Sequence, residues 1–269
     1  MVRNLLKEAA QKLSESESPM LDARVLLAAA MGKKDAALIF DMPDNAQLSL
    51  FNEYIEKRAE GIPVAYILGE KEFMGLNFHL NSDTLIPRPD TECLVEKVIE
   101  KNAFSSPKIL DLCAGSGCIG ISLAHFIKEA SCDLTDISEG AMKIAEENVA
   151  LNGVSGRCKV FRLDVLSDEI PAGYDIIVSN PPYIESDVVK NLEVSRFEPE
   201  RALDGGLDGL DFYKVIAKKA YNTLEKGAML ALEIGYNQGE SVKALLKDFS
   251  EISLFKDYGN NDRVIIAIK

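Results

Sequence analysis

The sequence predicts an α/β fold in which a mostly parallel β-sheet follows a small helical domain. From residue 108 to residue 249, short apolar runs alternate with longer stretches whose apolar residues recur at helical spacing. Before residue 70 only the helical spacing is present. Strands that alternate with helices are joined by right-handed crossovers, so we expect a parallel sheet with helices on both faces.

The N-terminal segment, residues 1–72, is expected to form the helical domain. The stretches "SPMLDARVLLAAAMG" and "QLSLFNEYIEKRAEG" each place apolar residues on one face and end at a glycine. Pro19 follows Ser18, which is a common order at the start of a helix. So short a bundle is either a structural appendage or a domain that binds a partner, and its residues leave both readings open.

Residues 73–90 are expected to form a hairpin and a linker, because the pattern changes there to short alternating stretches that contain Pro87 and Pro89. The main domain, residues 91–269, begins with a helix over 92–102. Strands are then expected at 108–112, 132–137, 158–165, 174–180 and 228–235, and helices at 117–130, 138–153, 211–227 and 239–249. Two closing strands complete a seven-stranded sheet; "DYGNND" between them is short enough for a hairpin, so one edge strand should be antiparallel.

The composition is that of a globular protein with a large core, because 47% of its 269 residues are hydrophobic and 27% are charged. No apolar run approaches the roughly 20 residues of a membrane-spanning helix. The N-terminus shows helical spacing, unlike a signal peptide. We therefore expect a cytoplasmic protein.

The cysteines are odd in number and contain no CxxC pair, which disfavours both a disulfide framework and a zinc site. Only His79 and His125 could join them as metal ligands, so we expect no metal centre. Free cysteines are usually small buried residues, and this reading is applied to Cys93, Cys113, Cys118, Cys132 and Cys158.

The formal net charge of −13 bears on the kind of partner. Proteins that bind a phosphate backbone usually carry basic stripes, because phosphate neutralisation supplies most of their affinity. The acidity therefore favours a basic protein partner or a small substrate, and we expect no direct nucleic-acid binding. We also expect a monomer.

Polar residues stand where the predicted parallel strands end, which is where ligands bind in open α/β sheets. These residues are Asp111 with "CAGSG", Asp136, Asp164, and Asn180 with "PPY". In the first loop, Gly115 and Gly117 would let the backbone approach a ligand, although tight turns use the same residues. The loop is not a Walker motif, since no Gly-Lys-Ser/Thr follows.

Asp136 follows the glycines at the spacing where an acid accepts hydrogen bonds from ribose hydroxyls. It could instead cap the helix that starts near Ser138. Asp164 could accept from the exocyclic amine of an adenine or could be a solvated loop residue. Together these positions favour a nucleoside ligand.

Asn180 is followed by two prolines, which remove two backbone donors and fix two φ angles. The Asn180 side-chain oxygen and the Pro181 carbonyl could each accept one N–H of an amide or an aromatic amine. Tyr183 would then supply a flat wall with weak attraction for a cationic methyl donor. This segment predicts a site that orients a planar NH2 group.

The sequence resembles the class I, Rossmann-like, S-adenosylmethionine-dependent methyltransferases, and within them the release factor glutamine methyltransferase family, PrmC or HemK. The resemblance rests on "PVAYILGEKEFMGLNFHLNSDTLIPRPDTE", "DLCAGSG", "SNPPYI", "FEPERALDGGLDGLDFYKVI", "LEIGYNQGESV" and "DYGNNDR". The family motif usually reads Gly-Thr-Gly-Ser-Gly where this chain has Cys113-Ala114-Gly115-Ser116-Gly117. One flexible glycine is thus replaced.

The resemblance implies methylation of the side-chain amide nitrogen of the glutamine in the Gly-Gly-Gln loop of class 1 release factors. It implies catalytic roles for Asn180, Pro181 and Tyr183, and substrate binding by Asn180, Pro181, Pro182, Tyr183 and Arg88. The cofactor would be bound by Asp111, Cys113, Ala114, Gly115, Ser116, Gly117, Asp136, Ile137, Asp164, Val165 and Asn180, and residues 1–72 would recognise the substrate. Arg88 could instead pair with a nearby acid.

Two other functions compete. A methyltransferase acting on an exocyclic amine of adenine or guanine in RNA or DNA shares the Asn-Pro-Pro-Tyr logic, but such enzymes need a basic rim around the extracted base. The third possibility is a nucleoside-binding or assembly protein that kept the fold without the chemistry.

Overall fold

The computed structural model describes residues 2–33 and 41–269. The chain divides into two compact units, Met1–Glu70 and Lys71–Lys269. The predicted helical domain includes residues 1 and 34–40, which lie outside the described residues.

The first unit is helical. Its helices are α1 (Val2–Lys12), α2 (Pro19–Ala30), α3 (Asn45–Ala59) and α4 (Val64–Leu68). Leu26, Leu27, Phe51 and Ile55 form the centre of its core. Helix α2 begins at Pro19 with Ser18 as its N-cap, which confirms the predicted start. Helix α4 was not predicted, because five residues are too short to show a helical period.

A hairpin of β1 (Glu70–Phe73) and β2 (Leu76–His79) follows. Its turn residues Met74 and Gly75 have φ angles of 53° and 73°, which is the conformation of a tight two-residue hairpin turn. The predicted hairpin is therefore present. Its first strand starts three residues before the predicted limit, at Glu70.

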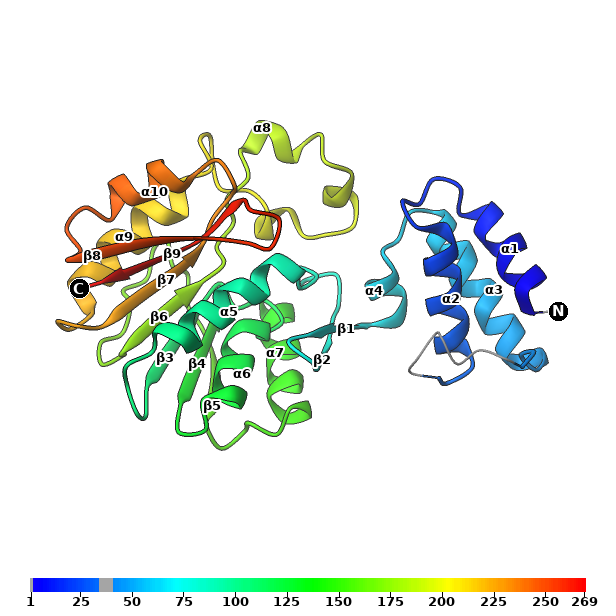
Figure 1. The fold of residues 1–269 in the computed structure, drawn as a ribbon, viewed down its shortest axis with the longest axis horizontal. Helices are drawn as coiled ribbons and strands as arrows, with labels where there is room; N and C mark the ends of the chain where they lie inside the picture. The colour runs from blue at the N-terminus through cyan, green and yellow to red at the C-terminus, as the bar shows by residue number, and fades with distance from the viewer. Residues whose placement is uncertain (1, 34–40) are drawn as a thin grey trace. The chain divides into compact units, whose positions relative to one another are not determined.

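The second unit contains a seven-stranded sheet with the order β5-β4-β3-β6-β7-β9-β8 (Figure 1). The strands are β3 (Lys108–Leu112), β4 (Ser131–Asp136), β5 (Cys158–Arg162), β6 (Ile176–Ser179), β7 (Met229–Glu233), β8 (Glu251–Lys256) and β9 (Asp262–Ile268). Strands β3 to β7 pair in parallel. The antiparallel pairing lies at one edge, where β9 runs against both β7 and β8. The sheet is thus mostly parallel, as predicted.

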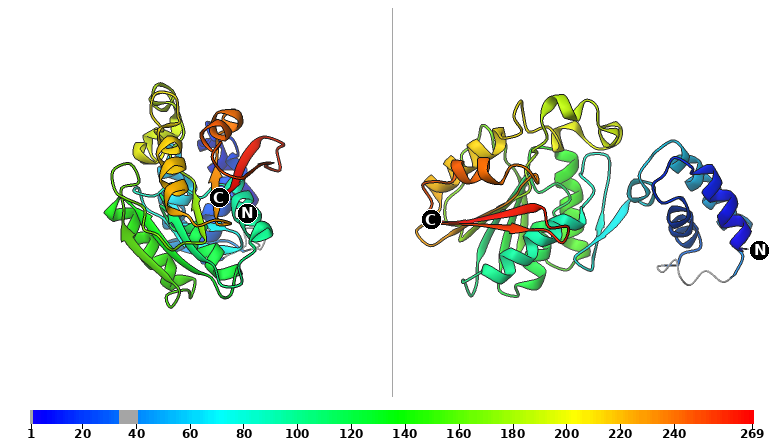
Figure 2. Two further views of the ribbon diagram at one scale, coloured as in Figure 1. Left: turned by 90° about the vertical axis from the view of Figure 1, so that its left-hand side faces the viewer. Right: turned by 45° about the horizontal axis from the view of Figure 1, so that its top comes forward.

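Helices cover both faces of this sheet (Figure 2). On one face lie α5 (Pro89–Lys101), α6 (Cys118–Phe126) and α7 (Glu139–Leu151), and on the other α9 (Asp211–Thr223) and α10 (Gly239–Leu245). Successive strand residues point to opposite faces: Ile109 packs in the first layer and Leu110 in the second. Because both faces are buried, the strands read as continuous apolar runs.

A long segment over residues 180–210 joins β6 to α9. It contains only the short helices α8 (Ser186–Val189), η2 (Glu193–Arg196) and η3 (Glu200–Ala202). A parallel bridge between Ile184 and Asp204 holds its two ends together. This bridge places the end of the segment beside the residues that follow Asn180.

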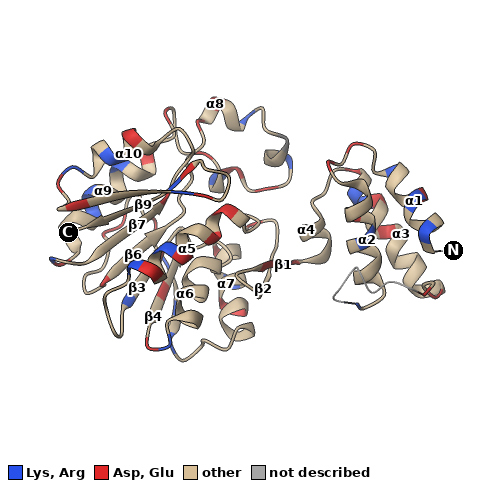
Figure 3. Cartoon of the chain, in the orientation of Figure 1, with Lys and Arg blue, Asp and Glu red and all other residues tan. Residues whose placement is uncertain are grey.

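Acidic and basic residues are interspersed along the second unit (Figure 3). None of the helices in the described ranges 2–33 and 41–269 is long and apolar enough to cross a membrane.

Candidate active site

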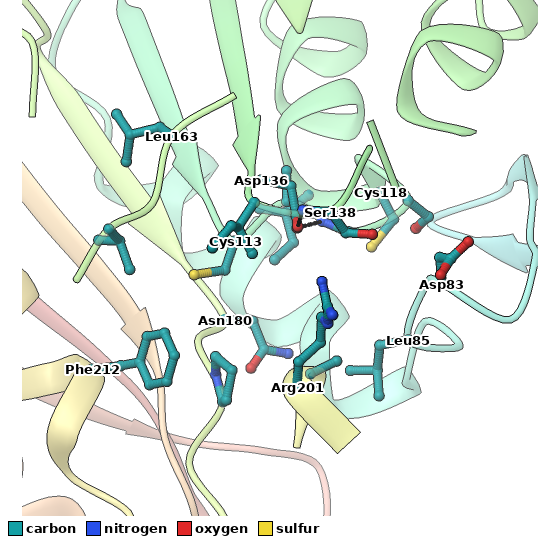
Figure 4. A pocket seen from close by; sticks show the side chains of 18 of the residues that line it. Asp83, Leu85, Cys113, Cys118, Asp136, Ser138, Leu163, Asn180, Arg201 and Phe212 are labelled. Carbon is teal, nitrogen blue, oxygen red and sulfur yellow. Dashed lines mark hydrogen bonds between the residues drawn. The ribbon is translucent and has the colours of Figure 1, made fainter. Parts of the chain in front are cut away.

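A cavity of about 400 Å³ lies at the carboxyl ends of the parallel strands (Figure 4). Every loop that follows β3, β4, β5 or β6 contributes to its wall, together with the segment before α5 and the end of the long segment before α9. The lining residues are Asp83, Leu85, Pro87, Arg88, Thr91, Cys113, Ala114, Gly115, Ser116, Cys118, Ile119, Asp136, Ile137, Ser138, Leu163, Asp164, Val165, Leu166, Asn180, Pro182, Arg201, Ala202 and Phe212.

The loop after β3 turns tightly into helix α6. Cys113, Gly115 and Gly117 have φ angles of 58°, 56° and 79°, so three residues of this loop adopt the left-handed conformation. A Cβ on Gly117 would lie 2.9 Å from Ile121 Cδ1 and 3.0 Å from Leu134 Cδ2. A Cβ on Gly115 would meet no protein atom within 4 Å. The loop is therefore tightly packed on its inner side and open at Gly115.

Asp136 fixes the loop to the end of β4. Its two carboxylate oxygens accept hydrogen bonds from the backbone N–H of Gly115 and of Ser138, each at 2.9 Å. Helix α7 is instead capped by Ser138, whose hydroxyl accepts from Ala141 N at 3.3 Å. The alternative that Asp136 is merely the helix cap is therefore wrong.

Asp111 lies behind the loop and is fully buried. Its Oδ2 accepts from Gly120 N at 2.9 Å, whereas Oδ1 has no partner within the described part of the chain. Burial raises the pKa of Asp111 to about 7, and the charge of Asp136 adds to the rise while the Gly120 N–H opposes it. Its side chain is not on the cavity wall.

Asp164 borders the cavity between the apolar side chains of Leu163 and Val165. Its carboxylate accepts from Leu166 N at 3.0 Å and from the Ser167 hydroxyl at 2.9 Å. Although partial burial opposes them, these hydrogen bonds hold the pKa of Asp164 below its ordinary value. An anionic acceptor next to apolar walls suits the edge and the faces of a purine.

Asn180 also borders the cavity and directly follows β6. Its Nδ2 donates to Thr91 Oγ1 at 3.3 Å. Pro181 and Pro182 are buried, and Tyr183 is partly buried. Of these residues, Asn180 and Pro182 border the cavity.

Hydrogen bonds and close packing fix the segment that follows Asn180. Gln238 Nε2 donates to the carbonyl oxygens of Tyr183 at 3.0 Å and of Gly209 at 3.2 Å. A Cβ on Gly205 would lie 2.6 Å from Tyr183 Cα, and a Cβ on Gly209 would collide with the Tyr183 carbonyl oxygen. Burial raises the pKa of Tyr183 to about 12, so its hydroxyl stays neutral at physiological pH.

Two arginines border the cavity. Arg88 forms an ion pair with Glu198 at 2.6 Å, and the Glu198 side chain is only 1% exposed. The acid-pairing reading of Arg88 is thus observed, although Arg88 also reaches the cavity wall. Figure 4 shows the Arg201 guanidinium pointing into the cavity toward Asp136 and Ser138.

Glu233, at the end of β7, is a buried carboxyl that sequence reasoning missed. Burial raises its pKa to about 7; hydrogen bonds from Thr91 and Asn180 and the charge of Arg263 act in the opposite direction. In the sequence it is the one acidic residue in the apolar stretch "AMLALEIG". An acidic residue within an apolar strand is the sequence signal that could have identified Glu233 as a buried carboxyl group.

The structure gathers most predicted site residues in one place. The loop residues Cys113 to Ser116 share the cavity with Asp136, Ile137, Asp164, Val165, Asn180, Pro182 and Arg88. Asp111, Gly117, Pro181 and Tyr183 stand outside the lining set. Four cysteines are buried as predicted, but Cys113 is only half-buried, and both Cys113 and Cys118 border the cavity. Among the residues the structure describes, no group of three or more His, Cys, Asp or Glu could hold a metal ion.

Comparison with known proteins gives two family matches. The PrmC N-terminal domain matches residues 4–69, and the methyltransferase small domain matches residues 89–198. A release factor glutamine methyltransferase of Clostridium botulinum is 38% identical over 282 residues, which cover 100% of this chain and 99% of that protein. One of Agrobacterium fabrum is 41% identical over 92% of this chain and 89% of that protein.

Among solved structures, the hMettl16 catalytic domain in complex with the MAT2A 3′UTR hairpin 6 is similar with a TM-score of 0.61. The match covers 80% of this chain and 81% of that one at 18% sequence identity. At this identity the likeness concerns the fold alone. It confirms the predicted Rossmann-like methyltransferase fold.

Proposed function

The chain belongs to the release factor glutamine methyltransferase family, and we propose that it methylates the side-chain amide nitrogen of the glutamine in the Gly-Gly-Gln loop of class 1 release factors. S-adenosylmethionine is the methyl donor. The observation that carries this proposal is that Asn180 and the loop Cys113 to Ser116 line one cavity. A methyl donor and an NH2 acceptor bound to them would therefore be neighbours.

The residues present fit the cofactor. The open face at Gly115 leaves room for a ligand against the backbone, and the Asp136 carboxylate stands beside it as an acceptor for ribose hydroxyls. Leu163 and Val165 would flank the adenine, with Asp164 as acceptor for its amine. We assign Asp111, Gly117 and Ile137 to the support of this pocket. The bound cofactor supplies an electrophilic methyl group.

The chain's own contribution is to orient the glutamine. An amide nitrogen is a poor nucleophile because its lone pair is delocalised into the carbonyl. Asn180 Oδ1 and the Pro181 carbonyl would each accept one N–H, so that the nitrogen lone pair faces the methyl group. These acceptors also stabilise positive charge that develops on the nitrogen. Pro182 borders the same cavity, and Tyr183, which lies outside the lining residues, would support this wall.

Positioning supplies most of the acceleration in this account. Holding two reactants in line can contribute on the order of 7 to 11 kcal/mol. A strong base is not required at the start, because the amide proton leaves only after positive charge has developed on nitrogen. The neutral Tyr183 hydroxyl is consistent with this assignment.

We assign the release factor as the partner, in agreement with the family. The first unit would recognise the body of the release factor. Arg88, held by Glu198, would contact the substrate at the cavity rim. We further propose that the protein acts in the cytoplasm, as a monomer and without direct contact to nucleic acid.

The proposal is tested by mass spectrometry of a class 1 release factor after incubation with the protein and S-adenosylmethionine. We expect a gain of one methyl group on the Gly-Gly-Gln glutamine of the intact factor. A parallel incubation with the isolated Gly-Gly-Gln peptide measures what the helical unit contributes. Methylation of ribosomal RNA in a third incubation, with none on the release factor, would contradict the proposal.

A further inference from the structure

The buried side chains of Glu233 and Thr91 lie next to Asn180. Strands β6 and β7 pair in parallel with Ser179 opposite Leu232. Asn180, the first residue after β6, is therefore in register with Glu233, the last residue of β7. Glu233 is 2% exposed, and its Oε2 has no partner among the described residues. Thr91, in the first turn of α5, is likewise 2% exposed.

One hydrogen bond joins two of the three side chains, and the third lies next to them. Asn180 Nδ2 donates to Thr91 Oγ1 at 3.3 Å. Hydrogen-bonding interaction with the Thr91 and Asn180 side chains counters the rise in the pKa of Glu233, so both side chains lie next to its carboxyl group. A threonine hydroxyl has a single proton, so a Thr91 that accepts from Asn180 can donate that proton to Glu233. Both acceptors thus lie on the NH2 side of the Asn180 amide.

We propose that Thr91 and Glu233 are positioning residues that fix the Asn180 amide with its oxygen toward the substrate. This inference rests on the proposed function and deepens it. A side-chain amide has donors on one side and an acceptor on the other. If Asn180 turned over, its NH2 would face the NH2 of the glutamine, and two donors cannot bind each other. Thr91 and Glu233 make the turned-over orientation of Asn180 unfavourable, because they present acceptors to which the Asn180 oxygen cannot donate.

The surroundings of Glu233 set its pKa near neutral pH. Arg263 of β9, which is paired with Asp257 at 3.1 Å and with Asp90 at 3.3 Å, offsets part of the burial cost of Glu233. The titratable groups that interact with the Glu233 carboxyl are Arg263, Asp90, Tyr183, Tyr213, Cys93 and Cys118. An ionised Glu233 only accepts, whereas a protonated one can donate to Asn180 Oδ1 and release the amide from its orientation.

The first test replaces the hydroxyl of Thr91. In the full-length protein, Thr91→Val should lower kcat for release factor methylation by roughly 10²-fold, the scale of a misplaced reacting group. KM for the release factor and Kd for S-adenosylmethionine should stay within a few-fold of the parent. Thr91→Ser keeps the hydroxyl and should restore most of kcat.

A matched control removes a hydroxyl next to the same strand end. Tyr213 donates to the Glu233 backbone carbonyl at 2.9 Å and does not touch the carboxyl group through that bond. Tyr213→Phe should lower the melting temperature while kcat remains near the parent value. If Thr91→Val keeps kcat, or if it and Tyr213→Phe both weaken cofactor binding and stability to the same extent, the positioning role is overturned.

The second readout is the pH profile of kcat. For the parent protein, kcat should fall as the pH drops through about 7, where Glu233 takes up its proton. Glu233→Gln should abolish that dependence, and an unchanged profile would contradict the inference. If the parent protein leaves the release factor unmethylated, the proposed function has failed; if the parent is active and the Thr91 and Glu233 variants behave like it, only the positioning role has failed.

Discussion

Asp136 and Gly115 are joined by a hydrogen bond of 2.9 Å from the Gly115 N–H to the Asp136 carboxylate. This bond ties the end of β4 to the loop that follows β3, and thus connects the expected ribose site to the glycine loop. The other carboxylate oxygen is occupied by Ser138 N. Asp136 therefore holds the shape of the cofactor pocket besides offering lone pairs to a ribose.

Asp136→Ala should weaken S-adenosylmethionine binding more than it destabilises the fold. The ribose hydroxyls lose their acceptor, and so do the two backbone N–H groups that shape the pocket. The expected rise in Kd, measured by calorimetry, is roughly 10- to 100-fold, the scale of one lost hydrogen bond to a charged group. Glu139→Ala is the control, since Glu139 is an exposed acid on the next helix. An unchanged Kd in Asp136→Ala would limit Asp136 to a structural part.

Cys113→Gly should stabilise the protein. Cys113 has a φ of 58°, a conformation that costs an L-residue about 1 kcal/mol and costs glycine nothing. Thermal unfolding should therefore show a higher melting temperature for Cys113→Gly. Cys113→Ala retains the Cβ and removes only the thiol. If both variants shift the melting temperature equally, the thiol contacts and not the backbone strain determine stability here.

Asp111 should make stability fall as the pH rises from about 4 to about 7. Its pKa of about 7 in the folded protein exceeds the ordinary value of 3.8, so the folded state holds a proton that the unfolded state has lost in this window. Asp111→Asn removes this ionisation. Its free energy of unfolding, measured by urea titration, should gain at least about 1 kcal/mol on the parent between pH 4 and pH 7. A difference that stays constant with pH would contradict burial as the cause.

Gly209→Ala should reduce turnover, because its Cβ would collide with the Tyr183 carbonyl oxygen and displace the segment that follows Asn180. Gly227→Ala is the matched control: Gly227 also has a positive φ, of 88°, but a Cβ there meets nothing within 4 Å. Both variants carry the same kind of backbone strain. Only Gly209→Ala should lose kcat in the release factor assay, by roughly 10-fold or more; equal losses would mean that strain alone is responsible.

Most of the sheet could be predicted from the sequence because it is buried on both faces. Strands such as Lys108–Leu112 read as continuous apolar runs, and the helices between them show a clear period. The short helices α4 and α8 gave no signal, since four or five residues are little more than one helical turn and cannot show a repeating pattern. The antiparallel pairing at the edge followed from the short joint before β9.

The site was predictable where topology alone brings residues together. Asp136 is the last residue of a parallel strand, Asp164 and Asn180 come just after such strands, and parallel strands end at the same edge. Thr91 and Arg201 were not found, because they come from segments whose paths are set by tertiary contacts. Glu233 is also at the end of a parallel strand, but the run was read as apolar, and its burial next to Asn180 depends on the register of β6 and β7.

The measurement that tests the account most directly compares the parent protein with Asn180→Ala. Turnover is followed by mass spectrometry of the release factor glutamine, and cofactor affinity by calorimetry. Since Asn180 Oδ1 is assigned to hold the glutamine NH2, the variant should lose kcat by roughly 10²- to 10³-fold while it binds S-adenosylmethionine almost as tightly as the parent. Near-normal turnover in Asn180→Ala would contradict the account.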